Sequence, residues 1–175
     1  MTDAAIFNAP VHHHPAGPAH QCNLRPCARN SEQSAARIVA LTLIASGEVK
    51  PCEVAALEAI RAHELLGLTR EAWHDVVHAL CADLLLSATR RRDCVIDSTT
   101  IKRLLSDVDD IALQRLVLRV CATIIDADGQ IDDAEIIVLK AVFEHWGLLP
   151  NDQELPASAA YGSDFQIVLR ESQQT

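Results

Sequence analysis

Carboxylates gather in one short stretch of this chain, between Asp126 and Glu135. Asp126, Asp128 and Asp132 surround a glycine at position 129, and Glu135 follows six residues after that glycine. Calcium and magnesium prefer oxygen ligands, and a short loop between two helices can aim several carboxylates at one such ion. The stretch therefore predicts a helix-turn-helix joint that binds a divalent cation, with calcium, magnesium and manganese favoured over zinc.

The stretch matches the twelve-residue calcium loop only in part. With Gly129 at position 6 of such a loop, the four carboxylates occupy positions 3, 5, 9 and 12. Position 1 is then Ile124, whose side chain has no oxygen to begin the coordination sphere. A standard high-affinity EF-hand is therefore not expected here.

The joint has a counterpart upstream, because a shift of 82 positions places residues 45–53 on residues 127–135. The identical pairs under this shift are Ala45/Ala127, Gly47/Gly129, Glu53/Glu135, Leu57/Leu139, Ala59/Ala141 and His63/His145. The upstream copy has only Glu48 and Glu53 as acidic residues. The chain therefore reads as a tandem duplication of one helical pair, with repeats at about 36–68 and 117–149.

Composition points to a helical protein with an aliphatic core. Hydrophobic residues make up 49% of the 175 residues, but aromatic residues only 3%. The net charge of −9 argues against nucleic acid as a partner, because phosphate binding depends on clustered Lys and Arg. No secretion signal precedes the six cysteines, and the longest apolar run is interrupted by charged residues. We therefore expect a cytoplasmic protein with reduced thiols and no membrane span.

Apolar periodicity predicts an all-α domain over residues 31–149, with a compact bundle of about six to seven helices built from the two helix-turn-helix repeats. A tail without fixed structure is expected over 1–30 and a second tail over 150–175. The last helix is apolar nearly all round and is expected at the centre of the core. The expected helices run over 31–45, 51–66, 69–87, 98–105, about 107–125 and 132–146, with a connector at 88–97. Residues that favour helix starts are Ser31 for the first of these helices, Thr69 for the third, Ser98 or Thr99 for the fourth, and Ser106 or Asp107 for the fifth.

The two joints also carry a family resemblance. Both follow a pattern close to A-x-G-x-[VI]-x-x-x-E-x-x-x-L, each after an apolar helix and with a helical section between them. Over about residues 31–149 this arrangement resembles the tellurite-resistance TerB-like family. The resemblance implies a compact helical, non-enzymatic stress-response protein that binds a divalent cation. It also implies a protein partner, such as an integral membrane protein at the cytoplasmic face. The J-domain branch is excluded, because no His-Pro-Asp triplet is present.

In that family the acidic residues of the two motifs lie close together on one surface. Carried onto this chain, they correspond to Asp128 and Glu135 in the second motif and to Glu53 in the first. Ser46 stands where the first motif usually has its aspartate, a departure that Asp126, Asp132 and Glu48 could compensate.

Two further interpretations compete with a cation site. Glu135 and Asp132 can form a capping box at the start of the last helix, which would make the joint purely structural. The protein would then be a metal-independent helical interaction module that offers an acidic patch to a basic partner. The sequence leaves the oligomeric state open.

Histidines suggest two weaker zinc sites. His74 and His78 lie four residues apart on one expected helix, and Cys81 extends the same face, as in a zinc hydrolase. The aspartate at position 75 is shorter than the glutamate of that motif, and no further ligand follows. The N-terminal tail carries a second set that could hold a soft metal, consisting of His12, His13, His14, His20, Cys22 and Cys27. No phosphate loop, nucleophile motif or dinucleotide fingerprint is present, so we expect no enzyme.

Overall fold

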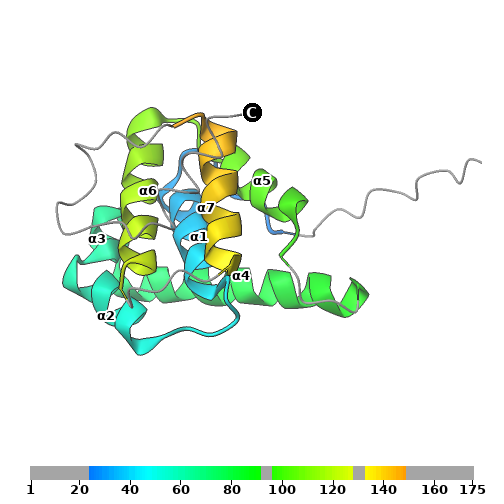
Figure 1. Ribbon diagram of the computed structural model, residues 1–175, viewed down its shortest axis with the longest axis horizontal. Coiled ribbons are helices and arrows are strands. Elements are labelled where there is room, and N and C mark those ends of the chain that lie inside the picture. Colours follow the sequence, from blue (N-terminus) through cyan, green and yellow to red (C-terminus); the bar gives the residue numbers. More distant parts are fainter. Residues whose placement is uncertain (1–23, 92–95, 128–132, 149–175) are drawn as a thin grey trace, which may run out of the picture.

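The computed structural model describes residues 24–91, 96–127 and 133–148 (Figure 1). These ranges form seven helices and no strand, which confirms the all-α prediction. The helices are α1 (Glu32–Ile44), α2 (Pro51–Ala59), α3 (Ala62–Leu65), α4 (Arg70–Arg91), α5 (Ser98–Ser106), α6 (Ile111–Ile125) and α7 (Asp133–Trp146). No helix among the described residues is long and apolar enough to cross a membrane.

Helix α1 lies at the centre of the bundle (Figure 1). It packs against α4, α5, α6 and α7, and every residue from 34 to 43 is buried. The expectation that the last helix would be central was wrong, because Ile137 of α7 is 58% exposed. Small residues explain the difference: alanines at 35, 36 and 40 allow neighbouring helices to approach α1 from several sides.

Side-chain caps fix the starts of several helices. The Ser31 hydroxyl accepts a hydrogen bond of 3.1 Å from the Ser34 amide, and the Thr69 hydroxyl accepts one of 3.2 Å from the Ala72 amide. Both caps were expected from the sequence. Two other helices are capped by residues other than those predicted.

Aspartates cap the two helices whose capping residues were misplaced. Asp97 caps α5 by accepting from the Thr100 amide at 2.7 Å, although Ser98 or Thr99 was expected. Asp110 caps α6 by accepting from the Leu113 amide at 2.8 Å. The expected caps at 106 and 107 instead end α5, so several residues separate these two helices.

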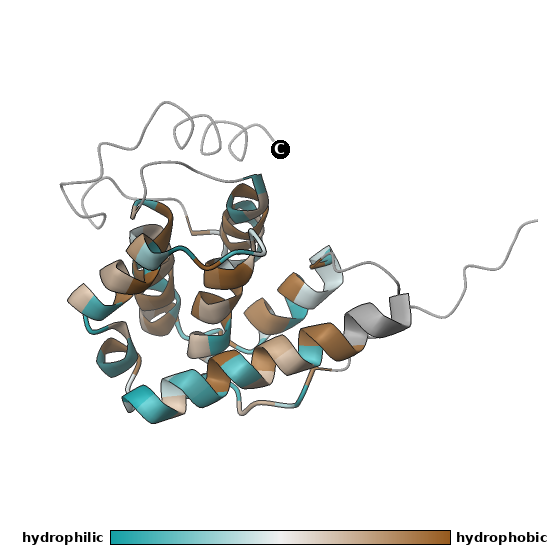
Figure 2. Ribbon diagram, turned by 90° about the horizontal axis from the view of Figure 1, so that it is seen from below, coloured by the Kyte–Doolittle hydropathy of each residue, from teal (hydrophilic) through white to brown (hydrophobic). Residues whose placement is uncertain are grey.

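Two other boundaries also differ from the prediction. The helix expected over 51–66 breaks into α2 and α3, because Arg61 adopts a left-handed conformation with φ of 52°. Helix α4 continues through Arg91, which shortens the expected connector at 88–97. In Figure 1 this helix crosses the base of the bundle and extends beyond it on one side, and in Figure 2 hydrophilic and hydrophobic residues alternate along it.

The segment before α1 belongs to the packed domain. Leu24 is buried, and the Asn30 amide donates to the Asp107 carbonyl oxygen at 2.8 Å. The Asn30 side-chain oxygen also accepts from the amides of Asp109 and Asp110. The expected tail therefore extends too far at its C-terminal end, because residues 24–30 pack on the helices. Residues 1–23 and 149–175, which hold the remaining tail predictions, lie outside the described part.

Candidate functional site

The helix ends that flank the two joints lie at the same end of the bundle (Figure 1). Helices α1 and α6 run in the same direction and finish at the lower end of that view, where α2 and α7 begin. The first joint is the segment 45–53 between α1 and α2, and the second joint is the segment 126–135 between α6 and α7. The repeats proposed from the sequence are thus compatible with this arrangement but are not established by it.

Glu53 of the first joint is a helix-capping residue. Its side chain is almost fully buried, with 1% exposed. One carboxylate oxygen accepts a hydrogen bond of 3.1 Å from the Lys50 amide, and the other lies 3.9 Å from the Lys50 ammonium nitrogen. This is the reciprocal half of a capping box, which satisfies an amide that the helix itself leaves unpaired. A cation arriving from solvent would have to displace these contacts.

The turn before Glu53 satisfies its own polar groups. The Ser46 hydroxyl donates to the Glu48 carbonyl oxygen at 2.8 Å, and the Glu48 amide lies 3.4 Å from the same hydroxyl. Gly47 has a φ of 82°, in the region where a side chain would be strained. Glu48 is exposed. The first joint therefore presents a single solvent-facing carboxylate.

The second joint is more acidic on its exposed side. Asp126 is exposed and forms the C-cap of α6, and Asp133 is exposed in the first turn of α7. Asp128 and Asp132 of the predicted site lie between them, outside the described residues. A carboxylate at a helix C-terminus is unfavourable, because that end carries a partial negative charge. In contrast, α1 ends on the neutral Ala45.

The predicted ligands fall into two groups. Glu53 and Glu135 are both buried, with 1% and 2% exposed, and so do not form part of an acidic surface. No group of three or more His, Cys, Asp or Glu side chains with the geometry of a metal site occurs in the described ranges. A cation site would therefore depend on Asp126 together with Asp128 and Asp132.

The described residues add no further ligand to the predicted zinc site of His74, His78 and Cys81. His74 and His78 are exposed on α4, and Cys81 is partly buried on the same helix. A catalytic zinc site needs three protein ligands and an open position. Within the part of the chain that the structure describes, no other ligand joins these residues.

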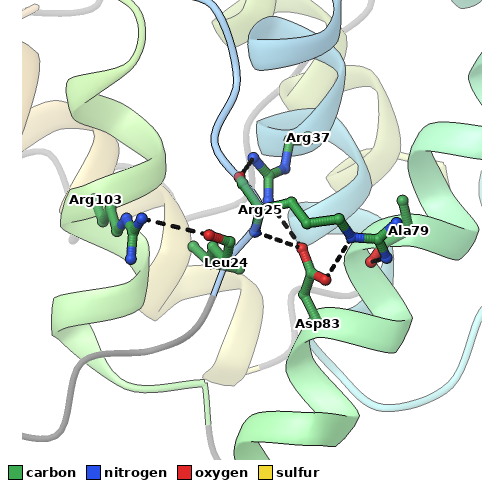
Figure 3. A network of polar contacts seen from close by, with 6 residues as sticks. All are labelled: Leu24, Arg25, Arg37, Ala79, Asp83 and Arg103. Carbon is green, nitrogen blue, oxygen red and sulfur yellow. Dashed lines mark hydrogen bonds and ion pairs between the residues drawn. The ribbon is translucent and has the colours of Figure 1, made fainter.

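A buried network of charges is the main polar feature that the sequence analysis missed (Figure 3). Asp83 of α4 and Arg37 of α1 are only 3% and 6% exposed, and the Arg37 guanidinium lies 3.2 Å from the Asp83 carboxylate. Arg25 reaches the same carboxylate with its backbone amide at 3.0 Å and its Nε at 2.7 Å. These contacts hold the segment before α1, at Arg25, against both α1 and α4. Its one sequence signal was an arginine that stands between Ala36 and Ile38 in a mostly apolar helix.

A second missed contact connects the two helices that precede the joints. The Thr42 hydroxyl of α1 donates to the Cys121 sulfur of α6 at 3.3 Å. Burial raises the pKa of the Cys121 thiol from 9.0 to about 11, although the hydrogen bond from Thr42 lowers it in part. This thiol is therefore a packing residue and is not a nucleophile.

No protein-family model, no curated protein and no solved structure matches this chain. The TerB-like resemblance therefore stays a prediction from the two motifs.

Proposed function

We propose that this chain is a non-enzymatic, TerB-like stress-response protein, of the tellurite-resistance type, that docks to a protein partner. In this proposal the second joint binds one divalent cation, and calcium, magnesium or manganese is the ion. The resemblance further suggests an integral membrane partner and a place at the cytoplasmic face. The first joint takes no ion.

One observation supports this proposal above the others, namely the exposed carboxylate of Asp126 at the C-terminus of α6. The helix dipole disfavours a negative charge at that position, and Asp128 and Asp132 add like charges nearby in the sequence. A bound cation would offset both repulsions at once. The joint would then hold α6 and the start of α7 in one arrangement that a partner can recognise.

A metal-independent interaction module remains the second candidate, and exposed apolar side chains near both joints support it. Val49 lies two residues before α2 and Val54 within its first half, and their side chains are 45% and 40% exposed. Ile137 in the first half of α7 is 58% exposed. Such residues are useful to a docking surface whether or not an ion is bound nearby.

Thermal unfolding of chelator-treated protein separates the two candidates. Calcium, magnesium or manganese is added to the parent chain, to an Asp126→Asn/Asp128→Asn variant and to a Glu48→Gln control. A ligand that binds only the folded state stabilises it by about 2.7 kcal/mol at a hundred times its dissociation constant. The proposal predicts a cation-dependent rise in the melting temperature for the parent and the control, and no rise for the double variant. If none of the three proteins responds, the metal-independent module is the better account.

A further inference from the structure

A pocket of about 340 Å³ lies beside the buried charge network, between the segment 25–27, α1 and α4. None of the residues that line this pocket belongs to either joint. Four small or aliphatic residues form its apolar wall, namely Pro26, Ala72, Val76 and Ala79. Small-molecule sites are commonly of this kind, with an apolar lining and a few polar groups that fix the orientation of the ligand. Its volume is at the lower end of the range for small-molecule sites.

The polar groups of the pocket are predominantly hydrogen-bond donors. Arg37 lines it with a side chain that is only 8% exposed. A guanidinium has five N–H groups. One NH group of Arg37 donates to the Arg25 carbonyl oxygen at 2.8 Å, and another donates to Asp83 at 3.2 Å. The other three have no acceptor among the residues that the structure describes.

The one buried carboxylate in the pocket is already used. Asp83 accepts from the backbone amide and the Nε of Arg25 and from the guanidinium of Arg37 (Figure 3). Two guanidinium groups therefore share one buried carboxylate, and the second acid of the lining, Asp75, lies on the exposed side of the pocket. A buried donor without an acceptor is costly, so the pocket favours a ligand that brings acceptor oxygens and one negative charge.

We propose that this pocket binds a small monocarboxylate with a short aliphatic chain. The carboxylate oxygens accept from Arg37, because the planar guanidinium matches a carboxylate in geometry and charge. The aliphatic chain lies against Val76 and Ala79. Asp75 lines the exposed side of the pocket and repels a second negative charge, so dicarboxylates and phosphate are disfavoured. This site is independent of the cation site proposed above.

The test uses butyrate as the probe and the full-length ¹⁵N-labelled protein. Backbone amide resonances of α4 and the Nε–H resonance of Arg37 are followed as butyrate is added. We expect a saturable shift with a dissociation constant in the millimolar range, as befits a ligand of this size. Butyramide has the same shape without the charge, and inorganic phosphate has charge without the aliphatic chain. Both should leave these resonances unchanged.

Two matched variants locate the site. Ala72→Leu fills the pocket from its wall, whereas Ala82→Leu makes the same substitution at an exposed position of α4 outside the pocket. Ala72 is partly exposed in the first turn of α4, so its replacement is expected to leave the fold intact, as the melting temperature will show. Butyrate binding should weaken by about tenfold or more in Ala72→Leu, which is about 1.4 kcal/mol, and stay unchanged in Ala82→Leu.

Three results would overturn the proposal. The first is the absence of a saturable shift in the parent protein. The second is an equal response to butyramide or a stronger response to phosphate. The third is butyrate binding that is the same in both alanine variants, because the ligand would then lie elsewhere on the molecule.

Discussion

The two joints place a glutamate in the same position, three residues into a helix, but surround it with different side chains. At the first joint, Glu53 and Ser46 bond to nearby backbone groups, and only Glu48 faces solvent as an acid. At the second joint, Glu135 is equally buried, but Asp126 and Asp133 are exposed on either side of the loop. The two joints therefore share a buried glutamate and differ in the acids that face solvent.

The comparison shows that the buried glutamates and the exposed aspartates have different physical explanations. Burial of Glu53 against Lys50 is what a helix start requires, whatever the protein does. An exposed aspartate at the C-terminus of α6 opposes the helix dipole and is not required by the fold. Such local conflicts are expected at functional sites. Four substitutions can break or sharpen this division, and the largest effect is expected away from both joints.

Replacing Arg37 with methionine should cost about 3 to 5 kcal/mol of unfolding free energy, because Asp83 would lose one of its buried partners. Urea unfolding measures this loss. Arg119→Met, at an exposed position of α6, is the matched control and should change stability by less than about 0.5 kcal/mol. Any cation response should persist in both variants. Loss of that response in Arg37→Met would show that the charge network and the second joint are coupled.

Alkaline pH should weaken the contact between the helices that precede the two joints. The pKa of Cys121 is raised, so the folded protein holds the thiol proton to higher pH than the unfolded chain does. The stability due to this thiol is present below pH 9.0 and is lost as the pH rises through about 11.

The measurement is unfolding free energy against pH for the parent and for Cys121→Ala. The parent should lose up to about 1.4 kcal/mol per pH unit more than the variant over that window. Parallel curves for the two proteins would contradict the burial of this thiol.

The capping role of Glu53 can be tested directly at the first joint. Glu53→Ala removes the acceptor for the Lys50 amide and should cost about 1 to 3 kcal/mol. Chemical denaturation should give the same loss in chelator and in calcium. Glu48→Ala, at the exposed acid of the same turn, should be nearly neutral. A loss seen only in calcium would instead assign Glu53 to an ion site.

The smallest expected effect concerns Asp126. In chelator, Asp126→Asn should stabilise the protein by about 0.3 to 1 kcal/mol, because it removes a negative charge from the C-terminal end of α6. In saturating calcium the same substitution should destabilise, because a ligand is lost. Differential scanning calorimetry under both conditions shows whether the sign reverses. No reversal would leave Asp126 as an ordinary surface acid.

Local signals predicted the helices well. Hydrophobic spacing located all of the described helical segments, and the caps at Ser31 and Thr69 were recognised because a hydroxyl precedes an apolar periodic run. The break at Arg61 was missed, since the left-handed region is more typical of glycine or asparagine than of arginine. The caps at Asp97 and Asp110 were misplaced because hydroxyl residues nearby offered equally good local signals.

Long-range contacts could not be predicted from one sequence. The partners Arg37 and Asp83 are 46 residues apart, and nothing in the local pattern around either residue names the other. The central position of α1 depends on long-range contacts as well, because it packs against four helices that lie far from it in the sequence. The burial of Glu53 and Glu135 was likewise missed. Their acidity suggested a surface, whereas a capping glutamate can be buried when its oxygens are bonded to backbone amides.

The asymmetry of the two joints can be measured most directly with manganese. A paramagnetic ion broadens the amide resonances of residues close to it, so a small amount of Mn²⁺ is added to ¹⁵N-labelled, chelator-treated protein. We predict early loss of the resonances of Ala127 and Asp133, while those of Gly47 and Glu48 persist. The Asp126→Asn/Asp128→Asn variant should keep all four. Equal broadening at both joints, or broadening centred on Glu48, would contradict a single ion site at the second joint.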